Sequence, residues 1–94
     1  MIVRWVKLTI DPNRVEEFVA LFTAYRDDIV RFEGCQMVEL LQDVDEANVF
    51  VTHSHWDSEE ALNKYRNSEL FGQIWPATKL LFIAIPEVSS YFRK

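Results

Sequence analysis

Strand-like and helix-like segments follow one another along this chain of 94 residues in an order that occurs in few folds. Residues 2–10 are rich in β-branched and aromatic side chains, which favours a strand. Apolar side chains then recur every three or four positions from Val15 to Phe32, and this spacing predicts an amphipathic helix. Asn13 with Glu16 predicts a capping box at its start, and Gly34 predicts a left-handed C-cap at its end.

The second half of the chain begins with a predicted hairpin. Residues 35–43 and 48–56 have the composition of two strands, and the acidic stretch 44–47 between them is typical of a turn. Residues 87–93 again have strand composition. They follow Pro86, which we expect to end the helical region before it.

The helical region between these strands is predicted to consist of two pieces. Asp57 or Ser58 caps its first turn, and Ser68 restarts it after an interruption. Gly72 and Pro76 predict that the second piece is bent or broken, because proline lacks the N–H donor that a helix interior requires.

The resulting order, β-α-β-β-α-β, is that of an α+β ferredoxin-like fold. Such a fold is a four-stranded antiparallel sheet with two helices on one face. The length fits one domain spanning residues 1–94.

Both faces of the predicted strands are apolar, although helices can cover only one of them. The open face of a one-sided antiparallel sheet is normally polar. We therefore expect a second copy of the sheet to cover it in a two-fold homodimer. Strand alternation assigns these residues to the interface: Val3, Trp5, Val49, Val51, His53 and His55.

Composition excludes several classes of function. The formal charge of −5 argues against nucleic acid as a partner, since phosphate binding requires a basic surface. No apolar stretch is long enough to span a membrane, and strand-like residues follow Met1 directly, so we expect no membrane partner and a cytoplasmic location. Cys35 is the only cysteine and has no basic sequence neighbour, which predicts an inert thiol.

Three stretches together carry a family resemblance: Glu33-Gly34-Cys35, the run from His55 to Leu62, and the run from Tyr65 to Ser68. With these motifs the chain resembles the antibiotic biosynthesis monooxygenase family from residue 1 to about 93. The resemblance implies a dimeric α/β barrel. It also implies one of two chemistries. One branch oxidises phenolic or anthrone-like polyketides to quinones with dioxygen and without metal, flavin or heme, and the other degrades heme.

Carried over by position, the resemblance favours the first branch. Trp56 occupies the shared tryptophan, but Val6 and Trp75 stand where the heme branch has its Asn and its His ligand, so heme degradation is not expected. The amide of the quinone-forming branch falls on Thr52, and the common second-helix His falls on Tyr65. The implied function is a monooxygenase of a small aromatic compound that uses no cofactor and no metal.

Small hydroxyl residues on the helix-covered strand face predict a pocket. Thr52 and Ser54 leave space there that branched aliphatic side chains would fill in a packed core. The alternative is that Trp56 is a core anchor whose indole N–H bonds to a backbone carbonyl. The candidate pocket residues are Trp56, Thr52, Ser54, Phe22, Phe71, Trp75 and Tyr65.

Two further groups have open interpretations. His53 and His55 share one strand face and would need a third ligand, such as Glu39, to hold zinc, so a polar part of the interface is the favoured interpretation. Tyr25 and Tyr65 would act as acid or base only with a strongly shifted pKa. A non-catalytic dimer that binds or senses a small aromatic molecule in the same pocket therefore stays open beside the monooxygenase.

Overall fold

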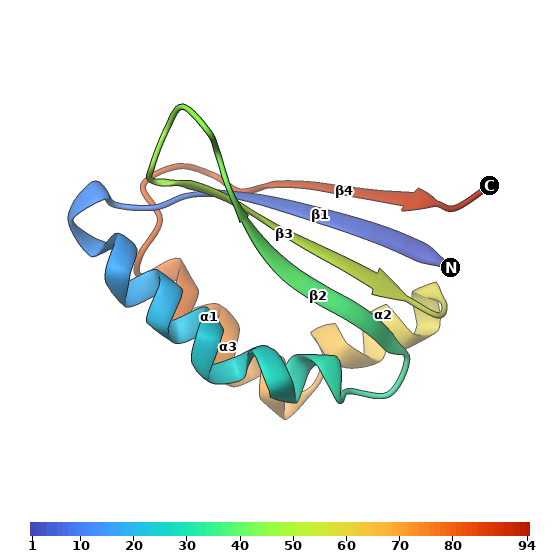
Figure 1. Cartoon of the computed structure of the whole chain (residues 1–94). Coiled ribbons are helices and arrows are strands. Elements are labelled where there is room, and N and C mark those ends of the chain that lie inside the picture. Colours follow the sequence, from blue (N-terminus) through green and yellow to red (C-terminus); the bar gives the residue numbers. More distant parts are fainter.

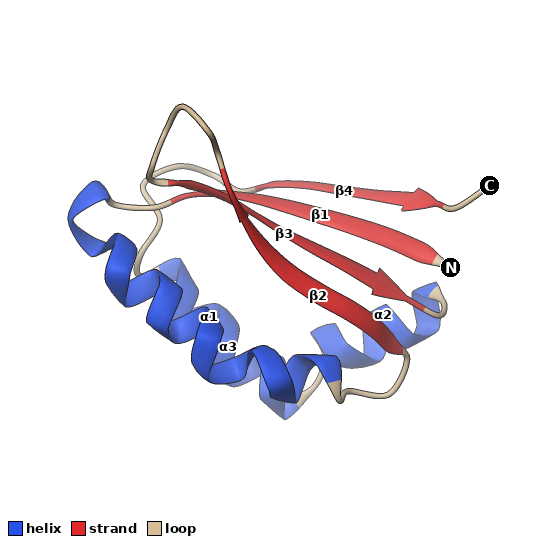
Figure 2. Ribbon diagram, viewed as in Figure 1, coloured by secondary structure: helices blue, strands red, loops and turns tan.

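The computed structural model describes all residues 1–94 and has the predicted ferredoxin-like architecture. Four antiparallel strands lie in the order β2-β3-β1-β4, and all helices cover one face of this sheet (Figures 1 and 2). The elements in chain order are β1 (Ile2–Thr9), the 3₁₀ turn η1 (Pro12–Arg14), α1 (Val15–Val30), β2 (Cys35–Gln42), β3 (Val49–Trp56), α2 (Glu59–Arg66), α3 (Glu69–Lys79) and β4 (Glu87–Phe92).

The start of α1 differs from the predicted capping box. The Asp11 carboxylate accepts a hydrogen bond from the Asn13 backbone N–H at 2.9 Å, and Arg14, the N-cap of α1, makes no side-chain cap bond. The prediction for Asn13 and Glu16 was wrong because the chain turns through η1 first. That turn moves the capping position back to Asp11.

The two pieces of the second helical region are confirmed. Ser58 caps α2 and Ser68 caps α3, each accepting a bond at 3.1 Å from a backbone N–H three residues later. However, α3 continues through Pro76 and ends at Lys79, well before Pro86. The proline costs only the bond to the Gly72 carbonyl, and Gly72 is exposed, so water can satisfy that carbonyl.

Gly34 has the predicted positive φ, +89°, but not the predicted position. The C-cap of α1 is Arg31, and Gly34 lies three residues further on, where the chain enters β2. Its carbonyl accepts a bond from the Asp57 N–H at 2.8 Å, and a Cβ at this position would lie 2.4 Å from the Cβ of Ala61. The glycine therefore allows close contact between this connection and the start of α2.

The core has two adjoining clusters between sheet and helices. Trp56 is 1% exposed and lies in the first cluster; Ile10 is fully buried and lies in the second. Leu81 follows α3 and packs in the second cluster. No helix is both long and apolar enough to cross a membrane.

Candidate functional site

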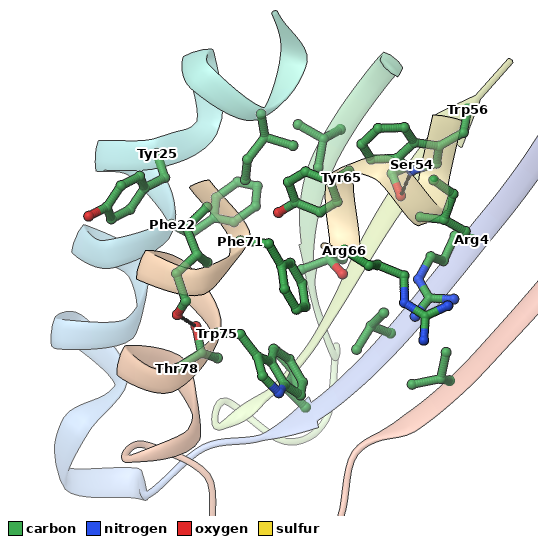
Figure 3. A pocket seen from close by; sticks show the side chains of 18 of the residues that line it. Arg4, Phe22, Tyr25, Ser54, Trp56, Tyr65, Arg66, Phe71, Trp75 and Thr78 are labelled. Atoms are coloured by element: carbon green, nitrogen blue, oxygen red, sulfur yellow. Dashed lines mark hydrogen bonds between the residues drawn. The ribbon is translucent and has the colours of Figure 1, made fainter. Parts of the chain in front are cut away.

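A cavity of about 470 Å³ lies between the helices and the sheet, a volume typical of sites for small organic ligands (Figure 3). Strands β1 and β3 supply its floor, and side chains from all three α-helices form its walls. The structure brings all the predicted pocket residues to this one cavity: Phe22, Thr52, Ser54, Trp56, Tyr65, Phe71 and Trp75. That a ligand occupies it stays a prediction.

A continuous series of aromatic rings forms one wall. Trp56 stacks on Tyr65 with ring centroids 4.9 Å apart, and Tyr65 meets Phe71 edge-on at 5.2 Å. Phe71 then stacks on Trp75 at 5.6 Å, because residues four apart share one face of α3. This wall offers a planar aromatic ligand both faces and edges for contact.

The floor contains a buried polar pair. The Trp56 Nε1–H donates to the Ser54 Oγ at 3.0 Å, and both residues are buried. The alternative we considered, a bond from this indole to a backbone carbonyl, is therefore wrong. Serine two residues before a tryptophan on the same strand face suits this role, because both side chains point under the helices.

Tyr65 serves better as a donor than as a base. Burial, followed by the nearby Cys35, raises the pKa of its phenol far above the ordinary value. The hydroxyl therefore keeps its proton at neutral pH and points toward Phe22 and Phe71 (Figure 3). Tyr25 also lines the cavity, but its hydroxyl points away from the other lining groups (Figure 3).

Sequence reasoning missed a polar rim. Arg4 of β1 and Arg66 of α2 line the cavity and lie together in Figure 3, with Asn63 and Asn67 also among the lining residues. The signal was present, because strand alternation points Arg4 to the same face as its apolar neighbours Val6 and Leu8. No Asp, Glu or His lines the cavity.

The predicted interface face carries a hydrogen-bonded histidine pair. His53 Nδ1 lies 2.9 Å from Glu39 Oε1, and the Nε2 atoms of His53 and His55 are 3.0 Å apart. Trp5 stacks on His53 with centroids 4.4 Å apart. The register brings Glu39, the predicted third ligand, to the pair. Nevertheless, no group of three or more His, Cys, Asp or Glu residues is placed to hold a metal ion.

The remaining residues assigned to that face differ in accessibility. Val3, Val51 and both histidines are half-buried, and Trp5 is 36% exposed. Val49 is only 4% exposed, and its backbone bonds to Asp43 and Glu46 join it to the β2–β3 turn. Val49 therefore presents little surface to a partner.

Cys35 is placed as an unreactive thiol. Burial raises its pKa, and the Sγ donates to the Met37 carbonyl at 3.6 Å. A thiol with a raised pKa carries little thiolate at neutral pH and is a poor nucleophile.

Comparison with known proteins agrees with this architecture. A conserved protein from Methanosarcina mazei Go1 shares 23% identity with a TM-score of 0.92, over 100% of this chain and 94% of that one. A protein from Mycobacterium tuberculosis shares 17% identity with a TM-score of 0.90, over 99% and 94%. A structure named antibiotic biosynthesis monooxygenase shares 17% identity with a TM-score of 0.92, over 100% and 99%.

No curated protein sequence is significantly similar to this chain. The sequence model of one family, however, matches residues 1–75, which include β1, α1, the β2–β3 hairpin, α2 and the first part of α3. Trp56 and most of the cavity lining lie within the matched residues. The chain belongs to the antibiotic biosynthesis monooxygenase family.

Proposed function

We propose that this protein is a cofactor-independent monooxygenase that oxidises a small phenolic or polyketide-like aromatic compound with dioxygen. The observation that carries the proposal is the aromatic-walled cavity beside Trp56, in a chain of the antibiotic biosynthesis monooxygenase family. Its volume and lining suit a planar ring system. No cofactor or metal is part of the proposal.

The reaction balances without an added reductant. A phenol with a free para position and one dioxygen give a para-quinone and one water, so the substrate supplies all the electrons. The substrate reacts as its phenolate, which is favoured by nearby positive charge. Arg4 and Arg66 supply that charge, and Tyr65 donates a hydrogen bond to a substrate oxygen.

One observation favours the alternative, a dimer that only binds or senses an aromatic molecule. The cavity contains no carboxylate or imidazole to remove the phenolic proton. In the monooxygenase, water at the polar rim must accept this proton. In a binding protein, no acceptor is needed.

We also propose that the protein acts as a homodimer through the open face of the sheet. Trp5 is 36% exposed there, next to the half-buried histidine pair. The edge strand β4 adds Tyr91 to this face, since Tyr91 pairs with Val3 and is 57% exposed. Partner burial of such side chains is a common use of exposed apolar patches.

Oxygen consumption tests the proposal. Purified protein treated with EDTA is mixed with 1-naphthol or anthrone, and dioxygen uptake and quinone absorbance are followed together. We expect one dioxygen per quinone. Ile74→Trp, which narrows the cavity, should lower the rate at least about tenfold, while Thr23→Val on the exposed surface of α1 should not change it. Binding of these compounds without uptake above the protein-free rate would establish the binding protein instead.

A further inference from the structure

We propose that Arg4 and Arg66 bind the carboxylate of the ligand, so that the cavity takes a planar aromatic acid in preference to a neutral aromatic compound. The inference rests on the proposed role of the cavity as the substrate site. It adds the chemical class of the group that lies at the rim, and one bound carboxylate leaves the arginine pair with a net positive charge that still favours the phenolate.

The charge of the cavity is opposite to that of the chain. The whole chain has a formal charge of −5, yet Arg4 and Arg66 are the only charged residues among those that line the cavity. In an acidic protein a cavity with only positive charge attracts anions and repels cations, because low-polarity walls strengthen the local field.

Neither guanidinium has an internal counter-ion. The four ion pairs of the chain join Lys7, Arg14, Arg31 and His53 to carboxylates, and none includes Arg4 or Arg66. Arg4 Nη1 donates to the exposed Ser90 Oγ at 3.1 Å, a neutral contact across the β1–β4 pair that orients the side chain without neutralising it.

Without a ligand this arrangement is electrostatically unfavourable. Burial, followed by the charge of Arg66, lowers the pKa of Arg4. A half-buried cation beside a second cation is costly unless an anion joins them. A carboxylate between two planar guanidinium groups would offset this cost through charge-assisted hydrogen bonds of matching geometry.

The two arginines lie at the same end of the cavity as Trp56 and Tyr65 (Figure 3). Arg4 lies opposite Ser54 in the β1–β3 register, and Arg66 follows Tyr65 in α2. From Tyr65 the aromatic wall continues through Phe71 to Trp75. A ring that packs against the aromatic wall therefore leaves its acid group beside the arginines.

Carboxylate fits this rim better than phosphate does. Phosphate sites commonly use the free N–H groups of a helix N-terminus. Here the nearby N-terminus of α3 already has a side-chain cap, because the Phe71 N–H donates to the Ser68 Oγ at 3.1 Å. The rim thus offers two planar guanidinium groups rather than a loop of backbone N–H groups that could bind phosphate.

Calorimetric titration at low salt tests the inference with matched probes. We expect 2-naphthoate to bind at least about tenfold more tightly than the neutral isostere 2-naphthamide, and Arg4→Gln or Arg66→Gln to remove most of this preference, since each charge-assisted bond contributes about that factor. Arg26→Gln, an exposed arginine of α1 outside the cavity, should change nothing. Thermal unfolding checks that each variant folds. If Arg4→Gln does not fold, the variant at the exposed Arg66 tests the inference alone.

The outcomes separate this inference from the proposed function. If 1-naphthol is bound and oxidised while 2-naphthoate binds no better than 2-naphthamide, the carboxylate site is wrong and the monooxygenase stands. If the preference for 2-naphthoate persists in both arginine variants, or 2-naphthyl phosphate binds tenfold more tightly than 2-naphthoate, the assignment is also wrong. If no naphthalene probe binds, both proposals fail.

Discussion

The buried bond between Trp56 and Ser54 allows one side chain to be tested directly. We expect Ser54→Ala to lower the free energy of unfolding by about 1–3 kcal/mol, because the buried indole N–H loses its acceptor. Urea denaturation measures this change. Ser89→Ala removes an exposed hydroxyl from β4 and should stay within about 0.5 kcal/mol of the parent. Equal effects of both changes would show that the bond contributes nothing.

At this scale the sequence predicted the sheet face that a side chain occupies better than the partner to which it bonds. Thr52, Ser54 and Trp56 could be assigned to the cavity because strand alternation fixes which face a side chain occupies. The hydrogen-bond partner of the Trp56 indole could not be predicted, since a hydrogen bond depends on rotamers that strand alternation does not determine. Arg4 was missed because an inward-facing arginine is meaningful only once its lack of a counter-ion is known.

Among the elements, the connection from α1 to β2 depends on Gly34. Gly34→Ala should destabilise the fold by about 2 kcal/mol or more, since it combines a positive φ with a Cβ 2.4 Å from that of Ala61. Gly72→Ala, in an open position of α3, should instead stabilise it by up to about 1 kcal/mol. Thermal unfolding compares the two.

The double variant Gly34→Ala/Ala61→Gly separates the causes, because it relieves the contact and keeps the backbone strain. A partial recovery is expected. If Gly34→Ala were as stable as the parent, the close approach would have no energetic role.

His55 of β3 predicts that the free energy of unfolding depends on pH. Burial, followed by the neighbouring His53 and Arg93, lowers the pKa of His55, while Glu39 opposes this change. Below about pH 6.5 the unfolded chain therefore takes up a proton before the folded protein does. Unfolding free energy should fall as pH decreases from 7 toward 5.5, and His55→Gln should reduce this slope. A slope that is unchanged in the variant would exclude His55 as its cause.

Element order was predictable because periodicity records which face of each segment is buried. The residues at which the helices and strands begin and end were less predictable. Pro76 lies inside α3 although proline usually interrupts helices, because the carbonyl that it leaves unpaired belongs to an exposed residue. Such exposure is a tertiary property and is absent from the local sequence.

For the whole molecule, the face of the sheet that the helices leave open predicts a homodimer. Trp5→Glu places a charge beside His53 on that face, so light scattering should change from twice 11.1 kDa to 11.1 kDa at micromolar concentration. Trp5→Phe keeps an apolar ring and should stay dimeric. A parent protein that is already monomeric under these conditions would contradict the proposed interface.

The central claim, that the cavity between helices and sheet binds an aromatic ligand, is tested most directly by NMR of the three indole N–H groups. Trp56 and Trp75 line the cavity, and Trp5 lies on the opposite face of the sheet as an internal control. Titration with 2-naphthoate should shift the Trp56 and Trp75 signals in a saturable manner, through ring currents and changed packing, and leave Trp5 unmoved. Saturable shifts confined to Trp5, or no shift of any indole with 2-naphthoate or 2-naphthol, would contradict the account.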